Sequence, residues 1–499
     1  MLGEEKHSIV SATERVLTTA AGTKIKLLQL PDREDWHHLS HPILFIRDFY
    51  ESFYDEYFGS YEKKLKVVVT GTRGIGKSAF GVYCIFRALK DGKTVVYNSA
   101  DRPLVFYVYS ATTVYTTTNA VVIAKLLDDF ANVVYLSDAL RPDVFPCPTG
   151  CFTSPKKEVW YEFAKEQETV LKIFGKWNRS NELELLREHC FSKVSVATMN
   201  QQVNIWGEIP RASLASSDNP SSSKRMADSL INTSDASVII RSEMLKETGK
   251  GDPFHRLIHL VPTENFEDGG RAFASSYVAD KLFDHYDKEF ESRMRSFLSD
   301  YDSTKSHLGG LAGPLFERLA WKTISAGGTF KMVNLTDKIE SEVELPKMGI
   351  IDLKDVGDID FKSTACYKPT SNIFGAVDFI SVLPSDLWLI NATIDKDHKV
   401  LMDSADGKSG LQRLTEKLQP NSTVKNFAFA FPPNVFDEFM EKKNLMPNPE
   451  WKLSNVEKKN ALINRLPVSK QNAFSKTFKW FAIRIPINRK YHTFRKLIR

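Results

Sequence analysis

The chain has 499 residues, of which 42% are hydrophobic and 26% charged, and its formal net charge is +5 at pH 7. This length exceeds what one hydrophobic core serves and predicts roughly two to four domains. No apolar run approaches the roughly 20 residues of a membrane-spanning helix, which excludes an integral helical membrane protein. Glu4 and Glu5 stand where a secretory signal needs apolar residues, so no signal peptide is expected.

Residues 1–60 are predicted to form a weakly patterned N-terminal region. Within it, "FIRDFYESFYDEYF", from Phe45 to Phe58, alternates rings and carboxylates at helical spacing. This spacing predicts a packed amphipathic helix in preference to a ligand-binding segment.

The next segment, "KLKVVVTGTRGIGKSAF", has the spacing of a phosphate-binding loop. Val67 to Val69 predict a buried parallel strand before the loop, and Ala79 to Leu89 predict a helix after it, ended by Asp91 and Gly92. A glycine-rich turn that matches by chance is the alternative, which the flanking strand and helix disfavour. The predicted nucleotide-binding residues are Gly71, Thr72, Arg73, Gly74, Ile75, Gly76, Lys77, Ser78 and Ala79.

The loop amides and the helix N-terminus would form an anion site. There Lys77 would neutralise the β- and γ-phosphates, and the Ser78 hydroxyl would ligate Mg²⁺.

Residues 61–212 alternate strand and helix, which predicts a parallel sheet covered on both faces. The clearest further strands are "TVVYNS", "LVFYVYS" and "NVVYLSD", and the third ends at Asp138. Asp138 would meet the Mg²⁺ held by Ser78, although an aspartate that caps a turn is the alternative. Ala139 follows where such enzymes often carry a glutamate, so hydrolysis is expected to be slow or to use another base.

Residues 213–310 are predicted to be a Ser-rich linker followed by a helical lid region. Between Arg211 and Ser237 the sequence is rich in Ser, Asn and Asp, which is typical of a flexible linker. "VIIRSEM" and "FHRLIHLVP" then predict strands, and residues 275–301 predict a long helix.

A second α/β pattern occupies residues 311–499. "GPLFERLAWKTISAGGTF" predicts a helix that carries Glu317 and ends at a glycine pair. Asp378 interrupts the strand "NIFGAVDFISVL", and Asn391 and Thr393 follow the apolar part of the next strand. These four side chains could bind Mg²⁺ or Mn²⁺ and activate water for attack on a phosphodiester. The alternative is that each acid caps a helix or forms a salt bridge.

The segment from Lys458 to Arg499 contains twelve Lys or Arg residues and no Asp or Glu, with aromatic residues between them. Cations interleaved with rings suit DNA, whose phosphates pair with the charges while its bases stack. A solvated basic tail or a nuclear import signal is the alternative.

Together these motifs resemble the Crinkler effectors and the related retrotransposon hot spot proteins. The resemblance implies a P-loop NTPase with a parallel sheet and a helical extension, followed by a restriction-endonuclease-like α/β domain. It implies ATP as the nucleotide, Ser154 as a polar sensor, and Arg211 reaching the γ-phosphate. The segments that carry it are "GTRGIGKSAF", "VVYLSDA", "FTSPKKEVWYEFAK", "WGEIPRA", "GPLFERLAWKTISAGG", "CYKPTSNIFGAVDFI" and "NATIDKDHKV".

For the second domain the resemblance implies a metal-dependent DNA nuclease with Glu317 and Asp378 as its acids. It also implies a secreted effector that acts in the host nucleus on DNA or a host nuclear protein. Two features depart from the pattern: Asn391-Ala392-Thr393 replaces the usual acid-x-lysine, and no delivery header is recognisable in residues 1–60. Lys396 or Lys399 could supply the missing cation. The alternative function is therefore a catalytically weak, nucleotide-gated module that binds DNA or a host protein.

Overall fold

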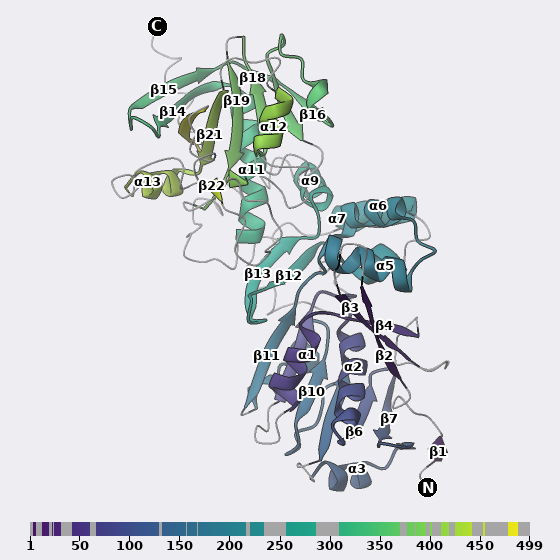
Figure 1. The fold of residues 1–499 in the computed structure, drawn as a ribbon. Helices are drawn as coiled ribbons and strands as arrows, with labels where there is room; N and C mark the ends of the chain where they lie inside the picture. The colour runs from purple at the N-terminus through teal and green to yellow at the C-terminus, as the bar shows by residue number, and fades with distance from the viewer. Residues whose placement is uncertain are drawn as a thin grey trace. The chain divides into compact units, whose positions relative to one another are not determined.

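The protein forms two compact units, Met1–His285 and Tyr286–Arg499, in a computed structural model (Figure 1). In both units helices pack against a sheet that contains parallel strands, so the predicted α/β class is confirmed. The predicted subdivision at residues 60, 212 and 310 stays a prediction. The structure describes residues 3–5, 12–18, 22, 24–30, 42–59, 66–128, 132–155, 157–166, 168–215, 220–233, 256–285, 309–369, 377–384, 386–395, 400–401, 411–418, 425–441, 453–454 and 478–487.

The first unit is built on an eight-stranded sheet. Five neighbouring strands of this sheet are mutually parallel, as the sequence predicts; in spatial order they are β6, β9, β10, β5 and β11. The edge formed by β7, β8 and β1 is antiparallel, which the sequence analysis did not predict. Only Ala100 and Asp101 connect β6 to β7, too few residues for a parallel crossover. The strand order is β1 (Gly3–Glu5), β8 (Val114–Thr117), β7 (Arg102–Tyr109), β6 (Thr94–Ser99), β9 (Val133–Asp138), β10 (Thr149–Phe152), β5 (Lys66–Gly71) and β11 (Thr169–Phe174).

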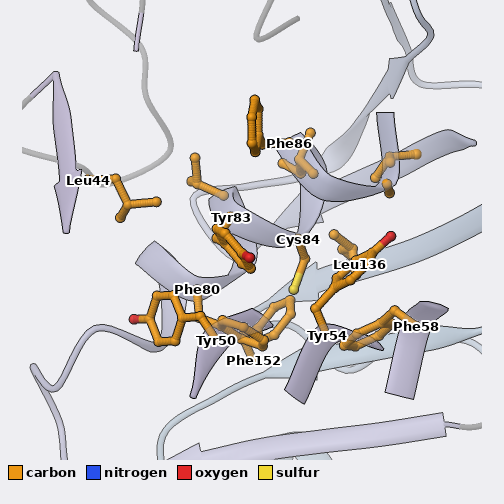
Figure 2. Packing of buried hydrophobic residues seen from close by; sticks show 14 of the residues in the cluster. Leu44, Tyr50, Tyr54, Phe58, Phe80, Tyr83, Cys84, Phe86, Leu136 and Phe152 are labelled. Carbon is orange, nitrogen blue, oxygen red and sulfur yellow. The ribbon is translucent and has the colours of Figure 1, made fainter. Parts of the chain in front are cut away.

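Helix α2 (Lys77–Lys90) and the short helix α1 (Tyr50–Tyr54), which continues into a π-helix (Asp55–Gly59), pack side by side on one face of the sheet. Figure 2 shows the aromatic contact, in which the buried Phe80 ring lies 4.7 Å from that of Tyr50 and 5.9 Å from that of Phe152. The helix predicted from Phe45 to Phe58 therefore begins too early. Phe45 belongs to β4 (Ile43–Ile46), where its ring packs against Trp177.

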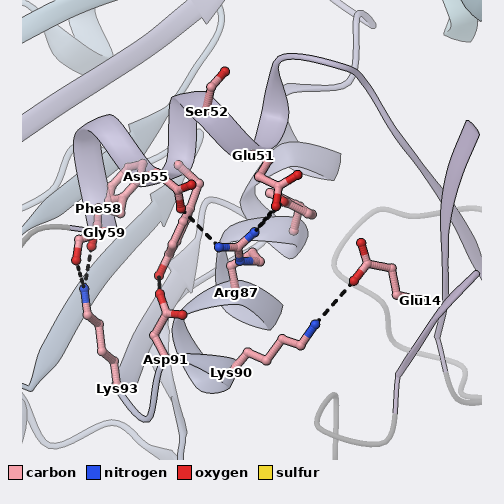
Figure 3. Close-up of polar contacts among 12 residues, drawn as sticks. Glu14, Glu51, Ser52, Asp55, Phe58, Gly59, Arg87, Lys90, Asp91 and Lys93 are labelled. Carbon is pink, nitrogen blue, oxygen red and sulfur yellow. Dashed lines mark hydrogen bonds and ion pairs between the residues drawn. The ribbon is translucent and has the colours of Figure 1, made fainter. Parts of the chain in front are cut away.

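Polar contacts fix α2 against α1 (Figure 3). The Arg87 guanidinium forms ion pairs with Glu51 at 3.3 Å and Asp55 at 3.1 Å. Beyond the helix, Lys93 Nζ donates to the carbonyl oxygen of Phe58 at 2.5 Å. Helix α2, which begins at the predicted phosphate loop, is thus fixed by ion pairs near its C-terminal end as well as by its buried apolar side chains.

The remaining elements of the first unit include helices that pack on the main sheet, such as α3, and others that lie outside it, such as α7. The predicted linker at residues 211–237 is wrong where it is described, because residues 220–233 form a helix, α7. Ala227 and Ile231 are buried one turn apart on it, so a single apolar face suffices despite the polar composition. "VIIRSEM" lies outside the described residues. These elements are β2 (Thr13–Thr18), β3 (Lys24–Gln29), α3 (Ala120–Leu127), α4 (Lys157–Trp160), a 3-10 helix (Phe163–Lys165), a π-helix (Arg179–Leu183), α5 (Glu184–Cys190), α6 (Val196–Trp206), a π-helix (Arg211–Ala215), α7 (Pro220–Thr233), β12 (Ile258–Pro262), β13 (Asp268–Phe273) and α9 (Ser276–His285).

The second unit has its own eight-stranded mixed sheet. Helix α11 (Gly309–Ser325) packs on one face, and α12 (Leu411–Leu418) and α13 (Pro433–Glu441) pack on the opposite face. β18 and β19 form an antiparallel hairpin, and α12 lies between the parallel strands β19 and β21 in the chain. The strand order is β15 (Glu340–Leu345), β14 (Gly328–Asn334), β23 (Lys479–Arg484), β21 (Lys425–Phe431), β19 (Leu387–Ala392), β18 (Phe379–Val382), β17 (Ala365–Pro369) and β16 (Gly349–Leu353). A 3-10 helix (Val356–Asp358) and a small pair of strands, β20 (Val400–Leu401) and β22 (Leu453–Ser454), complete the described elements.

The predicted basic tail is in part a core strand, which corrects its interpretation. β23 lies inside the sheet between β14 and β21. Phe478, Trp480 and Phe481 are only 5%, 1% and 8% exposed, so they cannot stack on nucleic-acid bases. Ile485 and Ile487 are buried as well, whereas residues 458–477 and 488–499 lie outside the described residues, and their contact with DNA stays a prediction.

Candidate functional site

The predicted phosphate loop lies at the carboxyl end of β5, in the interior of the parallel sheet between β10 and β11. Ligands of open α/β sheets bind outside the carboxyl ends of the strands. Gly74 and Gly76 have φ angles of +92° and +99°, a backbone conformation that favours glycine. A Cβ atom on Gly74 would also lie 2.8 Å from the Cβ of Arg211. The two glycines therefore allow both the turn and a close approach to the loop.

Lys77 points into the loop and is only 8% exposed. Its Nζ donates hydrogen bonds to the carbonyl oxygens of Gly71 at 2.9 Å and Thr72 at 3.0 Å. Burial lowers the pKa of Lys77 to about 7; the carboxylate of Asp138 opposes this shift, and the charges of Arg211 and Arg73 add to it. A bound polyphosphate would place negative charge beside this ammonium group and so favour its protonated form.

Ser78 and Asp138, 60 residues apart in the sequence, meet at this loop. Ser78 Oγ donates to Asp138 Oδ1 at 3.0 Å, and the hydroxyl of Tyr97 lies 3.5 Å from Asp138 Oδ2. A hydroxyl beside an acid is the pair that holds Mg²⁺ in P-loop proteins. Ala139 adopts a left-handed φ of +56°, which is uncommon for alanine and typical of strained functional loops.

Ser154 and Arg211 lie close to the same loop. Ser154 follows β10, and the amide of Thr153 donates to the Val69 carbonyl oxygen of β5 at 2.9 Å. The backbone amide of Arg211 donates to the carbonyl oxygen of Gly74 at 3.3 Å. Arg211 therefore contacts the loop directly, and Ser154 comes one residue after a backbone contact with the strand that leads into the loop.

Three further contacts on the loop were missed by the sequence analysis. The indole nitrogen of Trp177 donates to the Ile75 carbonyl oxygen at 2.8 Å, and the amide of Leu260 donates to Thr72 Oγ1 at 3.1 Å. The hydroxyl of Tyr50 lies 3.5 Å from the Gly76 carbonyl oxygen. None of these partners has a local sequence signal, because each reaches the loop only through the tertiary fold.

Nucleotide binding at this loop should take up a proton at alkaline pH. A bound polyphosphate favours the charged form of Lys77, whose pKa of about 7 leaves it mostly neutral at pH 8. Affinity should therefore fall as pH rises above 7, by at most about tenfold per pH unit for one proton. Calorimetry at pH 8 in two buffers of different ionisation enthalpy should give nearly one proton taken up per nucleotide. Uptake that is equal at pH 6 and pH 8 would contradict the assignment of Lys77.

In the second unit, Asp378 and Glu317 form an interacting acid pair. Asp378 lies directly before β18, where its Oδ2 accepts a hydrogen bond from the Ala392 amide at 2.6 Å. Burial, and next the charge of Glu317 on α11, raise the pKa of Asp378 well above its usual range. Two carboxyl groups in this relation share a proton or bind a cation.

Asn391 and Thr393 are buried at the end of β19, with exposures of 6% and 5%. Side chains alternate along a strand, so both follow Leu387 and Leu389 toward the face that α12 and α13 cover. Glu317 comes from α11 on the opposite face. The sequence analysis grouped Glu317, Asp378, Asn391 and Thr393 around one metal ion. The alternation of side chains along β19 does not favour this grouping, because it directs Asn391 and Thr393 to the face opposite α11. No cluster of three or more His, Cys, Asp or Glu that could hold a metal occurs among the described residues, and Lys396 and Lys399 lie outside them.

The chain is similar to Crinkler effector protein 16 of Phytophthora infestans, with 21% identity over 400 residues. The aligned region covers 75% of this chain and 60% of that protein, so the chain spans less than two thirds of its relative. No protein-family model and no solved structure matches the chain. Within the described part of the chain, no helix has the length and apolar character needed to cross a bilayer.

Proposed function

We propose that the first unit binds ATP as its Mg²⁺ complex and hydrolyses it slowly. One observation carries this proposal: Ser78 Oγ lies 3.0 Å from Asp138 Oδ1 at the mouth of a loop that encloses the Lys77 ammonium. Bound Mg²⁺ neutralises charge that develops on the phosphates. Ser78 and Asp138 would hold it, while Lys77 and the loop amides bind the phosphates and Arg211 approaches the outermost one.

Slow turnover follows from the residue after Asp138. The methyl group of Ala139 can neither accept a proton nor orient water, so this chain lacks the usual base at that position. In this proposal residues 61–212 are the NTPase core and residues 213–310 its extension.

Magnesium dependence tests the proposal directly. ATP affinity of the wild type should rise at least tenfold when Mg²⁺ replaces EDTA, because the ion bridges the phosphates to Ser78 and Asp138. Ser78→Ala should lose most of this gain while its affinity in EDTA stays unchanged. Ser110→Ala is the matched control, since the hydrogen bonds of the Ser110 side chain within the described part of the chain are all to Thr113, in its own turn. If the ATP affinity of the wild type is the same in Mg²⁺ and in EDTA, the proposed role of Ser78 is excluded.

For residues 311–499, within the second unit, we propose a nuclease-like domain that cleaves DNA slowly and prefers Mn²⁺. The support is the interacting acid pair of Asp378 and Glu317, whose carboxylate oxygens are the hard ligands that such ions prefer. The competing proposal is a nucleotide-gated module that binds DNA or a host protein without cutting. The neutral side chains of Asn391 and Thr393, and the face on which they lie, favour this alternative.

We further propose that the protein is a secreted effector that acts in the host nucleus. The similarity to a protein named as a Crinkler effector supports the effector role. The basic residues between Lys458 and Arg499 would bind DNA or direct nuclear import.

A further inference from the structure

The backbone of the phosphate loop is held from three separate segments of the first unit. The carbonyl oxygens of three successive loop residues each meet a donor from one of these segments. The contacts are Gly74 with the Arg211 amide at 3.3 Å, Ile75 with the Trp177 indole nitrogen at 2.8 Å, and Gly76 with the Tyr50 hydroxyl at 3.5 Å.

These contacts determine where the loop amides point. In a trans peptide unit the carbonyl of one residue and the amide of the next point in opposite directions. The amides of residues 75–77 therefore point away from the three donors, and none of them donates a hydrogen bond to another described residue. Successive amides that point into one concavity form an anion site. The outer contacts thus prepare the inner surface of the loop for phosphate oxygens.

Trp177 makes the shortest of the three contacts, and its own position is fixed from several sides. The residue is buried, and its backbone amide donates to the carbonyl oxygen of Glu208 at 3.0 Å. The ring of Phe45 lies 5.6 Å from the indole, and the guanidinium of Arg47 lies over it at 4.8 Å. The indole therefore has little freedom to move away from the loop.

Arg47 and Glu182 form a buried ion pair that also holds the backbone around Trp177. The Arg47 guanidinium donates to both carboxylate oxygens of Glu182, at 2.7 and 2.9 Å. It donates as well to the carbonyl oxygens of the two residues directly before Trp177, at 3.4 and 3.3 Å. Glu182 Oε2 in turn accepts from the amide directly after Trp177 at 2.7 Å. The ion pair thus fixes the chain on both sides of the indole.

We propose that Trp177 is a positioning residue for phosphate binding, whose indole N–H, held by Arg47 and Glu182, turns the loop amides toward the phosphates before a nucleotide binds. This inference rests on the proposed nucleotide binding and adds to it the residues that shape the site. Because the contact acts on the loop backbone, it serves any ligand with a phosphate chain, whatever its base or sugar. A loop that adopts the binding shape only part of the time binds with an affinity reduced by that fraction.

Trp177→Phe tests the inference through the affinities for the Mg²⁺ complexes of ATP and inorganic tripolyphosphate. Phenylalanine keeps a ring beside Arg47 but removes the donor to the Ile75 carbonyl oxygen. We expect both affinities to fall by the same factor, about threefold to tenfold, the effect of losing one neutral hydrogen bond.

Trp160→Phe is the matched control for this variant. Trp160 is as deeply buried, and its indole nitrogen has no hydrogen-bond partner among the described residues. Both affinities should therefore stay at the wild-type values. A loss in Trp177→Phe that affects ATP but not tripolyphosphate would overturn the inference, since the indole would then serve the base. Wild-type affinity of Trp177→Phe for both ligands would overturn it as well.

A double-mutant cycle tests whether Arg47 acts through the indole. Arg47→Lys keeps the charge but loses the paired hydrogen bonds to Glu182. It should weaken binding of both ligands in the wild type and add little in Trp177→Phe, although it should lower the melting temperature equally in both backgrounds. An equal loss of affinity in the two backgrounds would overturn the link between Arg47 and the loop. If the wild type binds neither ATP nor tripolyphosphate, the proposed nucleotide binding is wrong and this inference is overturned with it.

Discussion

Replacing Lys77 with methionine should abolish binding of MgATP, by at least about a hundredfold, while the melting temperature stays equal or rises. The lost ammonium is the charge inside the loop, and methionine preserves most of the side-chain volume. Because the folded pKa of about 7 lies below the unfolded value of 10.5, the folded state holds fewer protons between these values. The contribution of Lys77 to stability therefore improves as pH rises from 7 to 10.5, and below pH 7 the buried charge opposes folding. The gain in melting temperature should be largest at pH 6.

Lys93 provides a matched control for this variant. It is also buried, at 3% exposure, and its Nζ donates to the carbonyl oxygens of Phe58 at 2.5 Å and Gly59 at 3.4 Å. Its neighbouring charge is the acid Asp91 instead of two arginines. Lys93→Met should leave ATP affinity unchanged, because the Lys93 side chain bonds to Phe58 and Gly59 and not to the loop. Wild-type affinity in the Lys77 variant would show that the loop does not bind the nucleotide.

Asp378→Asn should eliminate Mn²⁺ binding and Mn²⁺-dependent DNA cleavage, by several orders of magnitude in rate, and should stabilise the protein above neutral pH. The amide can still accept the hydrogen bond from the Ala392 amide but carries no charge for a metal. The pKa of Asp378 is raised in the folded state, so its stabilising contribution is present at low pH and is lost as pH rises through that value. Asparagine does not titrate, so the variant does not lose stability at this position as pH rises. Calorimetric Mn²⁺ titration, plasmid cleavage time courses and melting at pH 8 measure the three effects.

Two further variants complete the test of the acid pair. Glu317→Gln should lose cleavage as Asp378→Asn does, because both acids are required. Asp386→Asn is the control, since Asp386 lies at the opposite end of β19, where Asn426 donates to it at 3.3 Å. Cleavage that persists in both acid variants would place the activity elsewhere. A wild type that binds DNA without cutting it would favour the nucleotide-gated binding module.

Local sequence patterns predicted the centre of the first unit well. Three consecutive valines and the following glycines identify β5, the loop and α2, because each signal lies within about ten residues of the structure it determines. The antiparallel edge was missed because two connecting residues decide it. Trp177 and Leu260 were missed for a different reason: their contacts with the loop depend on how distant segments pack.

The second unit shows how composition can conceal a strand. Twelve basic residues dominate the C-terminal segment, yet the six residues of β23 include the buried Trp480 and Ile483 at the centre of a sheet. The helix that carries Glu317 and the strand preceded by Asp378 follow from local patterns. The face occupied by Asn391 does not, because a shift of one residue in register moves every side chain of a strand to the opposite face.

The position of β23 also bears on how the second unit is completed during synthesis. Until residue 484 has left the ribosome, β14 and β21 each present an open edge where β23 later pairs with both. Open edges recruit strands from other chains, so nascent or prematurely terminated copies are prone to aggregate. A stop codon before residue 479 should therefore yield insoluble protein instead of a folded protein with a shortened tail.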